Sequence, residues 1–449
     1  MLVKIYIKIT KGNINDSITT SNSSVRNMYF NYIQINLLLE ANYDLVQKYI
    51  EQNKRLETYR KSLEDIYRYK EHTLSKVEEH LLASLSKVFG LSEEASYYLR
   101  NADMKFGKIK DENNKKQELT DSNYSIYIKS SNRKVRKRAF NEMFKTYESL
   151  INTYAALLSG TVEVNNESAR LRNYNSALEA SLYNDDIDAQ LYDKLIEDVH
   201  KGLPFLFKYY KLKKKVLGVD ELHIYDLYAE MVKSSDKKYE YEDAKKIIRN
   251  ALSVFGDEYI SVIDKAFNEN WIDVFENKEK KSGAYSWGSY TTDPYILTNY
   301  SYDYNGVSTL AHELGHSVHS YFSNKNNPYH MSSYPIFLAE IASTVNELLL
   351  AYYILDNTDD ENEKKYIISN MLELYRATIY RQTMFAEFEK DIHNQNMNGV
   401  TLTSETMNKI YFDKIKTYFA KNIKIDSKIK YEWARIHHFM FINMQQDLE

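Results

Sequence analysis

The stretch Val307-Ser-Thr-Leu-Ala-His-Glu-Leu-Gly-His-Ser-Val-His-Ser-Tyr-Phe322 places its apolar residues three or four positions apart, which is the spacing of one helix face. These apolar residues are Val307, Leu310, Ala311, Leu314 and Val318. Three histidines, at positions 312, 316 and 319, share a neighbouring face of the same helix. The pattern therefore predicts an amphipathic helix that carries a row of imidazoles.

Within this helix, His312-Glu-Leu-Gly-His316 has the composition and spacing of a zinc site. Imidazoles one turn apart can reach one tetrahedral ion, and Glu313 between them then lies beside the open coordination position as a general base. A catalytic site also needs a third protein ligand. His319 and His330 are not needed, because three protein ligands and a water leave no vacancy for them.

Gly315 lies inside the predicted helix, where glycine costs about 1 kcal/mol relative to alanine. Its presence indicates a close approach, either by substrate or by another backbone segment.

A second apolar helix is predicted after Pro335, and Glu340, Thr344 and Glu347 share one of its faces. Glu340 follows His316 by 24 residues, a spacing that a helix, a loop and a returning helix can close. Glu340 is therefore the candidate third ligand. Glu347 either accepts the remaining N–H of a ligand histidine or is an ordinary solvated or salt-bridged acid.

Residues 283–300 are aromatic and β-branched with two glycines, and they are the best strand candidate in the chain. An extended edge at 294–300 beside a metal site either pairs with the backbone of a bound peptide or braces the metal-site helix.

The rest of the chain is predicted to be mostly helical, because Gly (12) and Pro (4) are scarce among its 449 residues. Helical spacing runs from about Tyr43 to Leu99 with a stop at Gly90, and resumes as a long amphipathic pattern over 130–172. Residues 107–123 read as a loop or a short hairpin.

Gly202 and Pro204 interrupt the pattern further along, so a helical hairpin is predicted around 190–216.

Composition excludes several classes of function. The 59 basic and 63 acidic residues are well mixed and give a net charge of −4, so nucleic acid is not expected as a partner. Cysteine is absent, which excludes thiolate metal sites and favours a cytoplasmic location. Lys4 and Lys8 interrupt the only candidate signal segment, and Glu340 and Glu347 interrupt the most apolar run, so no membrane span is expected.

Segments along the chain from about Tyr43 resemble oligoendopeptidase F, within the thimet-oligopeptidase type of zinc metallopeptidases. In order, they are Asn101-Ala-Asp103 with Lys110-Asp-Glu112, Val135-Arg-Lys-Arg-Ala-Phe140, Ala177-Leu-Glu-Ala-Ser181, Gly283-Ala-Tyr285, Leu310-Ala-His-Glu-Leu-Gly-His316, His319-Ser-Tyr321, Phe337-Leu-Ala-Glu-Ile-Ala-Ser343, Arg381-Gln-Thr-Met-Phe-Ala-Glu-Phe-Glu389 and Trp433-Ala-Arg-Ile436.

The resemblance implies a mainly α, two-lobed helical body with a deep substrate channel and a small β element beside the active-site helix. Residues 1–160 would be the remnant of the helical N-terminal lobe, and 161–449 the catalytic zinc metallopeptidase domain. The implied activity is a zinc-dependent endopeptidase that hydrolyses internal bonds of short oligopeptides by attack of a zinc-bound water.

The resemblance also assigns roles to single residues. His312, His316 and Glu340 match the metal ligands of one Zn²⁺ per chain, although such a site also accepts cobalt or manganese. Glu313 matches the general base. His438 matches a C-terminal histidine of the family, near the substrate and the developing oxyanion.

The sequence departs from the family at both ends. The family has a longer N-terminal lobe, and after its C-terminal histidine a tyrosine-rich helix, whereas no tyrosine follows Tyr431 here. Codons from about position 439, read one base out of step, can encode Tyr-Val-Tyr-Gln-Tyr-Ala-Thr-Gly, which is similar to that helix. The alternative expectation is therefore a catalytically impaired, frameshift-truncated remnant that binds zinc or peptides without efficient turnover.

Overall fold

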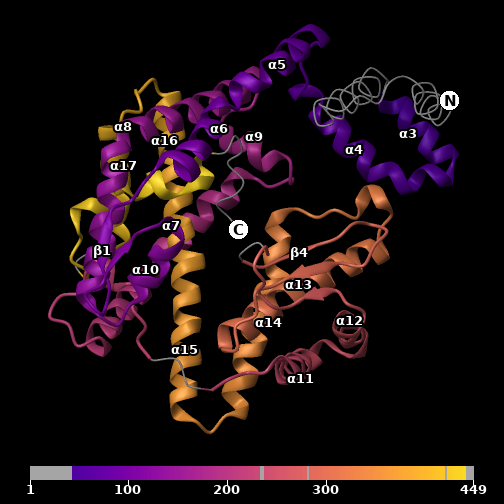
Figure 1. Cartoon of the computed structure of the whole chain (residues 1–449). Helices are drawn as coiled ribbons and strands as arrows, with labels where there is room; N and C mark the ends of the chain where they lie inside the picture. The colour runs from indigo at the N-terminus through magenta and orange to yellow at the C-terminus, as the bar shows by residue number, and fades with distance from the viewer. Residues whose placement is uncertain (1–42, 233–236, 281–282, 420–421, 441–449) are drawn as a thin grey trace. The chain divides into compact units, whose positions relative to one another are not determined.

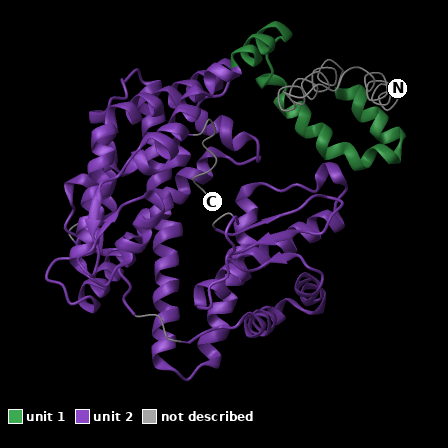
Figure 2. Cartoon of the chain, in the orientation of Figure 1, with its two compact units in different colours: residues 1–85 green, residues 86–449 purple. Residues whose placement is uncertain are grey.

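A computed structural model of the chain describes residues 43–232, 237–280, 283–419 and 422–440. The chain divides into two compact units, residues 1–85 and 86–449 (Figure 2). Residues 441–449, on which the frameshift expectation mainly depends, lie outside the described residues.

The lobe boundary expected at residue 160 falls inside α8 (Arg133–Leu171), a continuous helix of 39 residues. The division into compact units comes earlier, after Leu85. The assignment of 161–449 to a catalytic domain concerns the family's lobes and stays a prediction.

The described part of the first unit consists of short helices, as the sequence predicts. Val46 and Ile50 are its buried apolar residues, and the ring of Tyr43 meets that of Tyr67 edge-on, 4.8 Å between centroids. Its elements are α3 (Tyr43–Gln52), η1 (Lys54–Tyr59), α4 (Arg60–Arg68), η2 (Tyr69–His72) and most of α5 (Lys76–Phe89).

The second unit contains two large hydrophobic cores, and the first of these is packed around α8 (Figure 1). Aromatic side chains fill it, including Phe140, Phe144, Tyr147, Tyr154, Phe388, Tyr411 and Trp433. Its surrounding elements are α6 (Leu91–Tyr98), η3 (Leu99–Asp103), β1 (Lys108–Lys110), β2 (Lys116–Glu118), α7 (Asp121–Lys129), α9 (Ala177–Tyr183), α10 (Ala189–Val216), η4 (Ile224–Asp226), α16 (Gln382–Met397), α17 (Ser404–Phe419), η9 (Ser427–Arg435) and η10 (His437–Met440).

Three local predictions are confirmed in this unit. α6 begins directly after Gly90, β1 and β2 form an antiparallel hairpin within 107–123, and α8 occupies almost the whole of 130–172.

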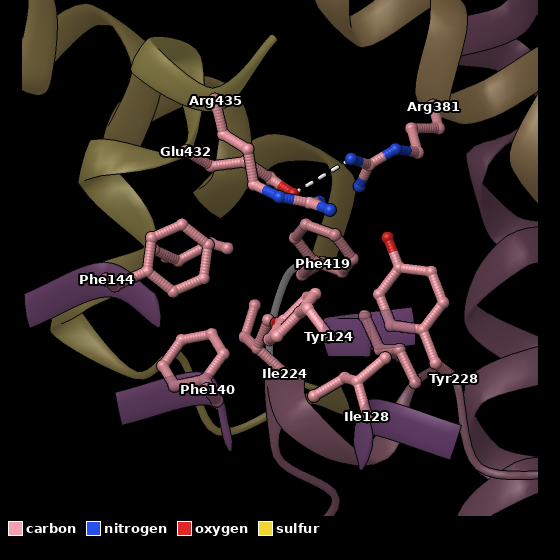
Figure 3. A pocket seen from close by; sticks show the side chains of 12 residues that line it. Tyr124, Ile128, Phe140, Phe144, Ile224, Tyr228, Arg381, Phe419, Glu432 and Arg435 are labelled. Atoms are coloured by element: carbon pink, nitrogen blue, oxygen red, sulfur yellow. Dashed lines mark hydrogen bonds and ion pairs between the residues drawn. The ribbon is translucent and has the colours of Figure 1, made fainter. Parts of the chain in front are cut away.

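A partly buried ion pair holds one side of the first core together. Arg381 donates to Glu432 Oε1 at 2.9 Å, and the hydroxyl of Tyr411 donates to Glu432 Oε2 at 2.6 Å. Beside this pair lies a cavity of about 20 Å³, lined among others by Tyr124, Tyr228, Arg381, Glu432 and Arg435 (Figure 3). A cavity of that volume has room for one water molecule. Arg381 opens one of the family-like segments and Glu432 directly precedes another, so the ion pair gives both segments a structural role.

The second core is built around α13, which packs against α14 on one side and receives buried residues from α11 and α12 (Figure 1). Val307, Leu310 and Leu314, three of the predicted apolar stripe, are fully buried there. Its elements are α11 (Tyr241–Ala251), η5 (Leu252–Phe255), α12 (Asp257–Asn268), β3 (Ile272–Asp273), β4 (Tyr285–Trp287), β5 (Tyr295–Leu297), α13 (Tyr304–Asn326), η6 (Tyr329–Met331), α14 (Ile336–Asn357) and α15 (Glu361–Tyr375), with the π-helix η7 (Arg376–Arg381) between α15 and α16.

Among the described residues, α14 is the single helix whose length and composition would suffice to cross a membrane. Here its buried residues, such as Ser343, Asn346 and Leu350, face the second core.

The predicted hairpin around 190–216 is wrong, because α10 runs through Pro204 without a break. A proline inside a helix removes one backbone hydrogen bond and crowds the preceding turn. Packing outweighs that cost here, since leucines on both sides of Pro204 are buried in the first core. Gly202 does not form a turn but allows a close contact with Tyr380. The hydroxyl of Tyr380 donates to the Gly202 carbonyl at 3.0 Å, and a Cβ on residue 202 would lie 3.1 Å from that hydroxyl oxygen.

The predicted strand over 283–300 is an antiparallel pair, β4 and β5, joined by a turn in which Gly288 closely approaches Pro294. The open edge expected at 294–300 is wrong, because β5 lies between β3 and β4. β5 contacts α13, which agrees with the other alternative, a strand that braces this helix. The Ile296 amide donates to the carbonyl of Trp271 at 2.7 Å, a pairing that brings in a segment remote from the predicted strand. The edge strand beside α13 is β4.

Gly315 of α13 lies against the backbone of α14. A Cβ at this position would be 2.6 Å from Ser343 Cα and 2.7 Å from the Ala342 carbonyl oxygen. Backbone approach is therefore the reason for this glycine, one of the two alternatives that the sequence left open.

We expect Gly315→Ala to destabilise the chain by about 1–3 kcal/mol, because the methyl group must push two backbones apart. The control is Gly160→Ala in α8, where a Cβ would meet only the side chain of Ser92, which can rotate away. That change should be neutral or stabilising, since alanine is the better helix former. Thermal unfolding followed by circular dichroism measures both; equal melting temperatures for the two variants would contradict the assignment.

Candidate metal centre

α13 presents the predicted imidazole row because its start is fixed locally. The side chain of Asp303 accepts a hydrogen bond from the Gly306 amide at 3.0 Å, which caps the helix. Gly306 is required there, since a Cβ would overlap the Ser301 carbonyl oxygen. From this start, His312 and His316 fall one turn apart on the face toward α14.

α14 returns antiparallel to α13 and brings Glu340 to both histidines. Asn346, fully buried, donates from its amide to the Ala311 carbonyl at 3.1 Å and accepts from the Tyr259 hydroxyl at 3.0 Å. This cross-link lies one residue before His312. Together with the contact at Gly315, it fixes α14 along α13.

Three side chains with ligand-type atoms converge at this contact. His312 Nε2 lies 3.1 Å from His316 Nε2 and 3.4 Å from Glu340 Oε2, and His316 Nε2 lies 3.3 Å from Glu340 Oε1. A tetrahedral zinc ion with bonds of about 2.0–2.1 Å has ligands about 3.3–3.4 Å apart. The observed spacings, measured to one or the other oxygen of Glu340, are close to that tetrahedron edge, so the cluster is consistent with a zinc site.

The other nitrogen of His312 is also occupied. His312 Nδ1 lies 2.5 Å from Glu347 Oε1, and the Ser308 hydroxyl donates to Glu347 Oε2 at 3.3 Å. In the tautomer with its N–H on Nδ1, toward this carboxylate, His312 would have the lone pair of Nε2 available for a cation. Burial alone would lower the pKa of His312, but the neighbouring carboxylates, Glu347 first, outweigh it and raise that pKa.

Glu340 is held in its ionised form. Its contact with His316, together with a hydrogen bond of 2.7 Å from the Ser343 hydroxyl, lowers its pKa to about 2 despite partial burial. A carboxylate that remains ionised at neutral pH has the charge that a divalent cation requires.

Glu313 lies in a different environment although it is next to His312. Its side chain is buried, and Oε2 has no hydrogen-bond partner among the described residues. Burial raises its pKa, against the opposing influence of the two histidines. This carboxylate therefore lacks a structural partner on one oxygen, and burial favours its protonated form.

His319 and His330 do not belong to the metal-type group that the described residues form, as the sequence predicts. The ring of His319 stacks on Tyr334 with 3.8 Å between centroids, and His330 lies in η6.

His438 also lies outside the metal-type group. It is in η10, which packs against α8 and α6, and its ring is 6.1 Å from that of Phe385 in the first core. Its expected role near the substrate stays a prediction.

Ser308, Ser343 and Asn346 support this site, although the sequence analysis did not single them out. The signal was available in part, because Ser343 and Glu347 follow Glu340 at helical spacing on one face. Nothing in the spacing distinguishes the buried Asn346 from an ordinary surface polar residue.

The family model described as Peptidase family M3 matches residues 126–444. The chain belongs to peptidase family M3. A second model, Oligopeptidase F, matches residues 38–106 of this M3 chain. The resemblance predicted from the sequence segments is thus confirmed.

Relatives place the M3 chain among oligopeptidase F homologues. It is 45% identical over 404 residues to oligopeptidase PepF of Bacillus subtilis, a match that covers 90% of this chain and 60% of that protein. It is 40% identical over 403 residues to an oligoendopeptidase F homolog of Lactococcus lactis subsp. lactis, covering 90% and 67%. The chain therefore spans about 60 to 67% of the length of these relatives.

A solved structure confirms the mainly helical fold. The crystal structure of oligoendopeptidase-F from Enterococcus faecium matches the M3 chain with a TM-score of 0.74 at 31% identity, covering 100% of this chain and 77% of that one.

We expect the M3 chain to bind about one zinc per chain, and Glu340→Ala to lose it while its helical spectrum is retained. Removing one of three ligands leaves two imidazoles, which hold zinc weakly. Metal analysis after gel filtration measures the ratio, with Glu405→Ala in the first turn of α17 as an exposed control. One zinc per chain in Glu340→Ala would contradict the ligand assignment.

Proposed function

We propose that this chain is a zinc-dependent endopeptidase that hydrolyses internal bonds of short oligopeptides. The observation that carries the proposal is the convergence of His312, His316 and Glu340 at tetrahedral spacing, with Glu313 beside them. The family and its oligopeptidase relatives support peptides as the substrate class. A two-lobed body with a deep channel, which would admit unstructured peptides and exclude folded proteins, is part of the same proposal.

The chemistry divides between the metal and this chain's residues. Zinc in the site would supply a Lewis acid, which polarises the scissile carbonyl and lowers the pKa of a water molecule. With the metal bound, the Glu313 carboxylate would accept the proton of that water as the water oxygen attacks the carbonyl carbon. Glu313 then passes the proton to the leaving amine nitrogen as the C–N bond breaks.

Glu347 and His438 complete the proposed machinery. Through its contact with Nδ1, Glu347 keeps Nε2 of His312 free to bind the metal. For His438 we propose the oxyanion-side role that its place in the motif suggests.

The peptide would bind as an added strand on β4. The amides of Ile296 and Thr298 donate toward β3. The main-chain N–H and C=O groups of the other β5 residues, Tyr295 and Leu297, therefore point toward β4. In the antiparallel register, Tyr285 and Trp287 pair with these two residues and point their main-chain groups toward β5. The N–H and C=O of Ser286, which lies between them, therefore point to the open edge. The side chain of Ser286 lies 2.8 Å from the hydroxyl of Ser317, next to His316, so this edge runs beside the metal centre.

The decisive experiment uses Glu313→Gln, which keeps the shape of the side chain but removes the proton acceptor. We expect zinc to remain bound, and hydrolysis of an internally quenched peptide to fall by at least about 10²-fold. Chelator should abolish the parent's activity, and Glu405→Gln should leave it unchanged. Zinc and peptide binding by the parent without turnover would favour the alternative of a remnant that only binds, and activity in Glu313→Gln near that of the parent would place the chemistry elsewhere.

Glu347→Gln should weaken zinc binding by roughly 10–100-fold, because an amide orients and polarises the imidazole less than a carboxylate does. Competition with a chromophoric chelator measures the affinity. An affinity equal to that of the parent would make Glu347 an ordinary salt-bridged acid, the other alternative from the sequence.

A further inference from the structure

The β4–β5 pair has two faces of opposite character. Side chains alternate along a strand, so Ser286 and Ile296 share the face toward α13, where Ile296 is buried and Ser286 meets Ser317. The outer face carries Tyr285, Trp287 and Tyr295, with exposed fractions of 46%, 75% and 59%. Large aromatic side chains are therefore open to solvent directly above the edge that borders the metal centre.

A peptide on this edge would bring its side chains to these rings in a fixed register. The peptide residue that pairs with the main chain of Ser286 would point its side chain toward α13, as Ser286 does. Its two neighbours would then point to the outer face, opposite Tyr285 and Trp287. Directly opposed residues in antiparallel strands have Cβ atoms about 4.5–5.5 Å apart, close enough for ring contact.

We propose that Tyr285 and Trp287 select peptides that carry large apolar or aromatic side chains two positions apart. This inference rests on the proposed peptidase function and adds the substrate class that the site prefers. Tyr295, the register partner of Trp287, extends the same aromatic face.

A short peptide fits this face better than another protein does. β4 has three residues, so its edge pairs with only a few residues of a partner. Stable protein interfaces bury about 800 Å² per partner, far more than three rings and a three-residue edge supply. A bound peptide gains from the same rings, because aromatic pairs contribute beyond simple burial.

Trp287 provides a direct readout. The chain has three tryptophans, and Trp271 and Trp433 are buried at 2% and 0% exposure. Acrylamide quenching and the emission maximum therefore report chiefly on Trp287. The probe is an alanine heptapeptide with two phenylalanines separated by one alanine, compared with a heptapeptide in which the two phenylalanines are adjacent.

In zinc-loaded Glu313→Gln, the spaced peptide should shift the emission to the blue, protect Trp287 from acrylamide and bind roughly tenfold more tightly than the adjacent one. Trp287→Ala should reduce the ratio of the two peptide affinities to about one, and Trp287→Phe should retain most of the difference. Phe205→Ala, at a similarly exposed aromatic on α10, is the matched control and should keep the full discrimination.

Equal affinity for the two peptides, or binding that leaves Trp287 accessible to acrylamide, would overturn the inference while hydrolysis still supports the peptidase. Protection of Trp287 that grows with protein concentration and without peptide would also overturn it, in favour of a second copy on this face. Tight, selective binding by a parent chain that hydrolyses nothing would support the aromatic face and refute the proposed function.

Discussion

The contact between the backbones of α13 and α14 determines the geometry of the metal centre. Helices with ordinary side chains between them pack with axes about 8–10 Å apart. Gly315 removes the side chain that would hold α14 away, and Asn346 ties α14 to the Ala311 carbonyl. Glu340, whose side chain is short, then reaches two imidazoles at once. The ligand atoms thus depend on residues that do not touch the metal position.

The same helix pair gives two carboxyl groups opposite environments. Glu340 contacts His316 and the Ser343 hydroxyl, which hold its pKa far below the usual range. Glu313 is buried with one oxygen unpartnered in the described chain, so its pKa is raised. Environments that move two pKa values apart allow two carboxyl groups to take different roles, which fits the proposed assignment of Glu340 as a charged ligand and Glu313 as the proton acceptor. This division requires no difference in residue type, only a difference in what surrounds each carboxylate.

The sequence predicts best where local periodicity decides the structure. The apolar stripe of α13, the long helix α8 and the stop at Gly90 could all be read from spacing. Tertiary packing decides the failures. Pro204 stays helical because buried leucines flank it, and β5 becomes the central strand because β3 comes from a remote segment.

The clustering of the three candidate ligands was predictable for the same reason as the helices. Two of them lie one turn apart on one helix, and the third lies on the next apolar helix. The prediction therefore required only that one loop bring these two helices together. The structure does not bring His438 into the metal-type group, and no periodic pattern connects the two segments. Asn346 was missed because its importance comes from the carbonyl opposite it, which only the packed helices reveal.

The small size of the β element limits how it can act. Strands of two or three residues are not stable alone, and this sheet depends on α13 and on the Trp271 segment for support. A short edge also gives other chains little to pair with, which lowers the risk of aggregation that open edges carry. For the same reason, the proposed main-chain pairing of a peptide on β4 would contribute only a few hydrogen bonds to its affinity. The remaining affinity must come from side chains, and the exposed rings of Tyr285 and Trp287 stand where those contacts would form.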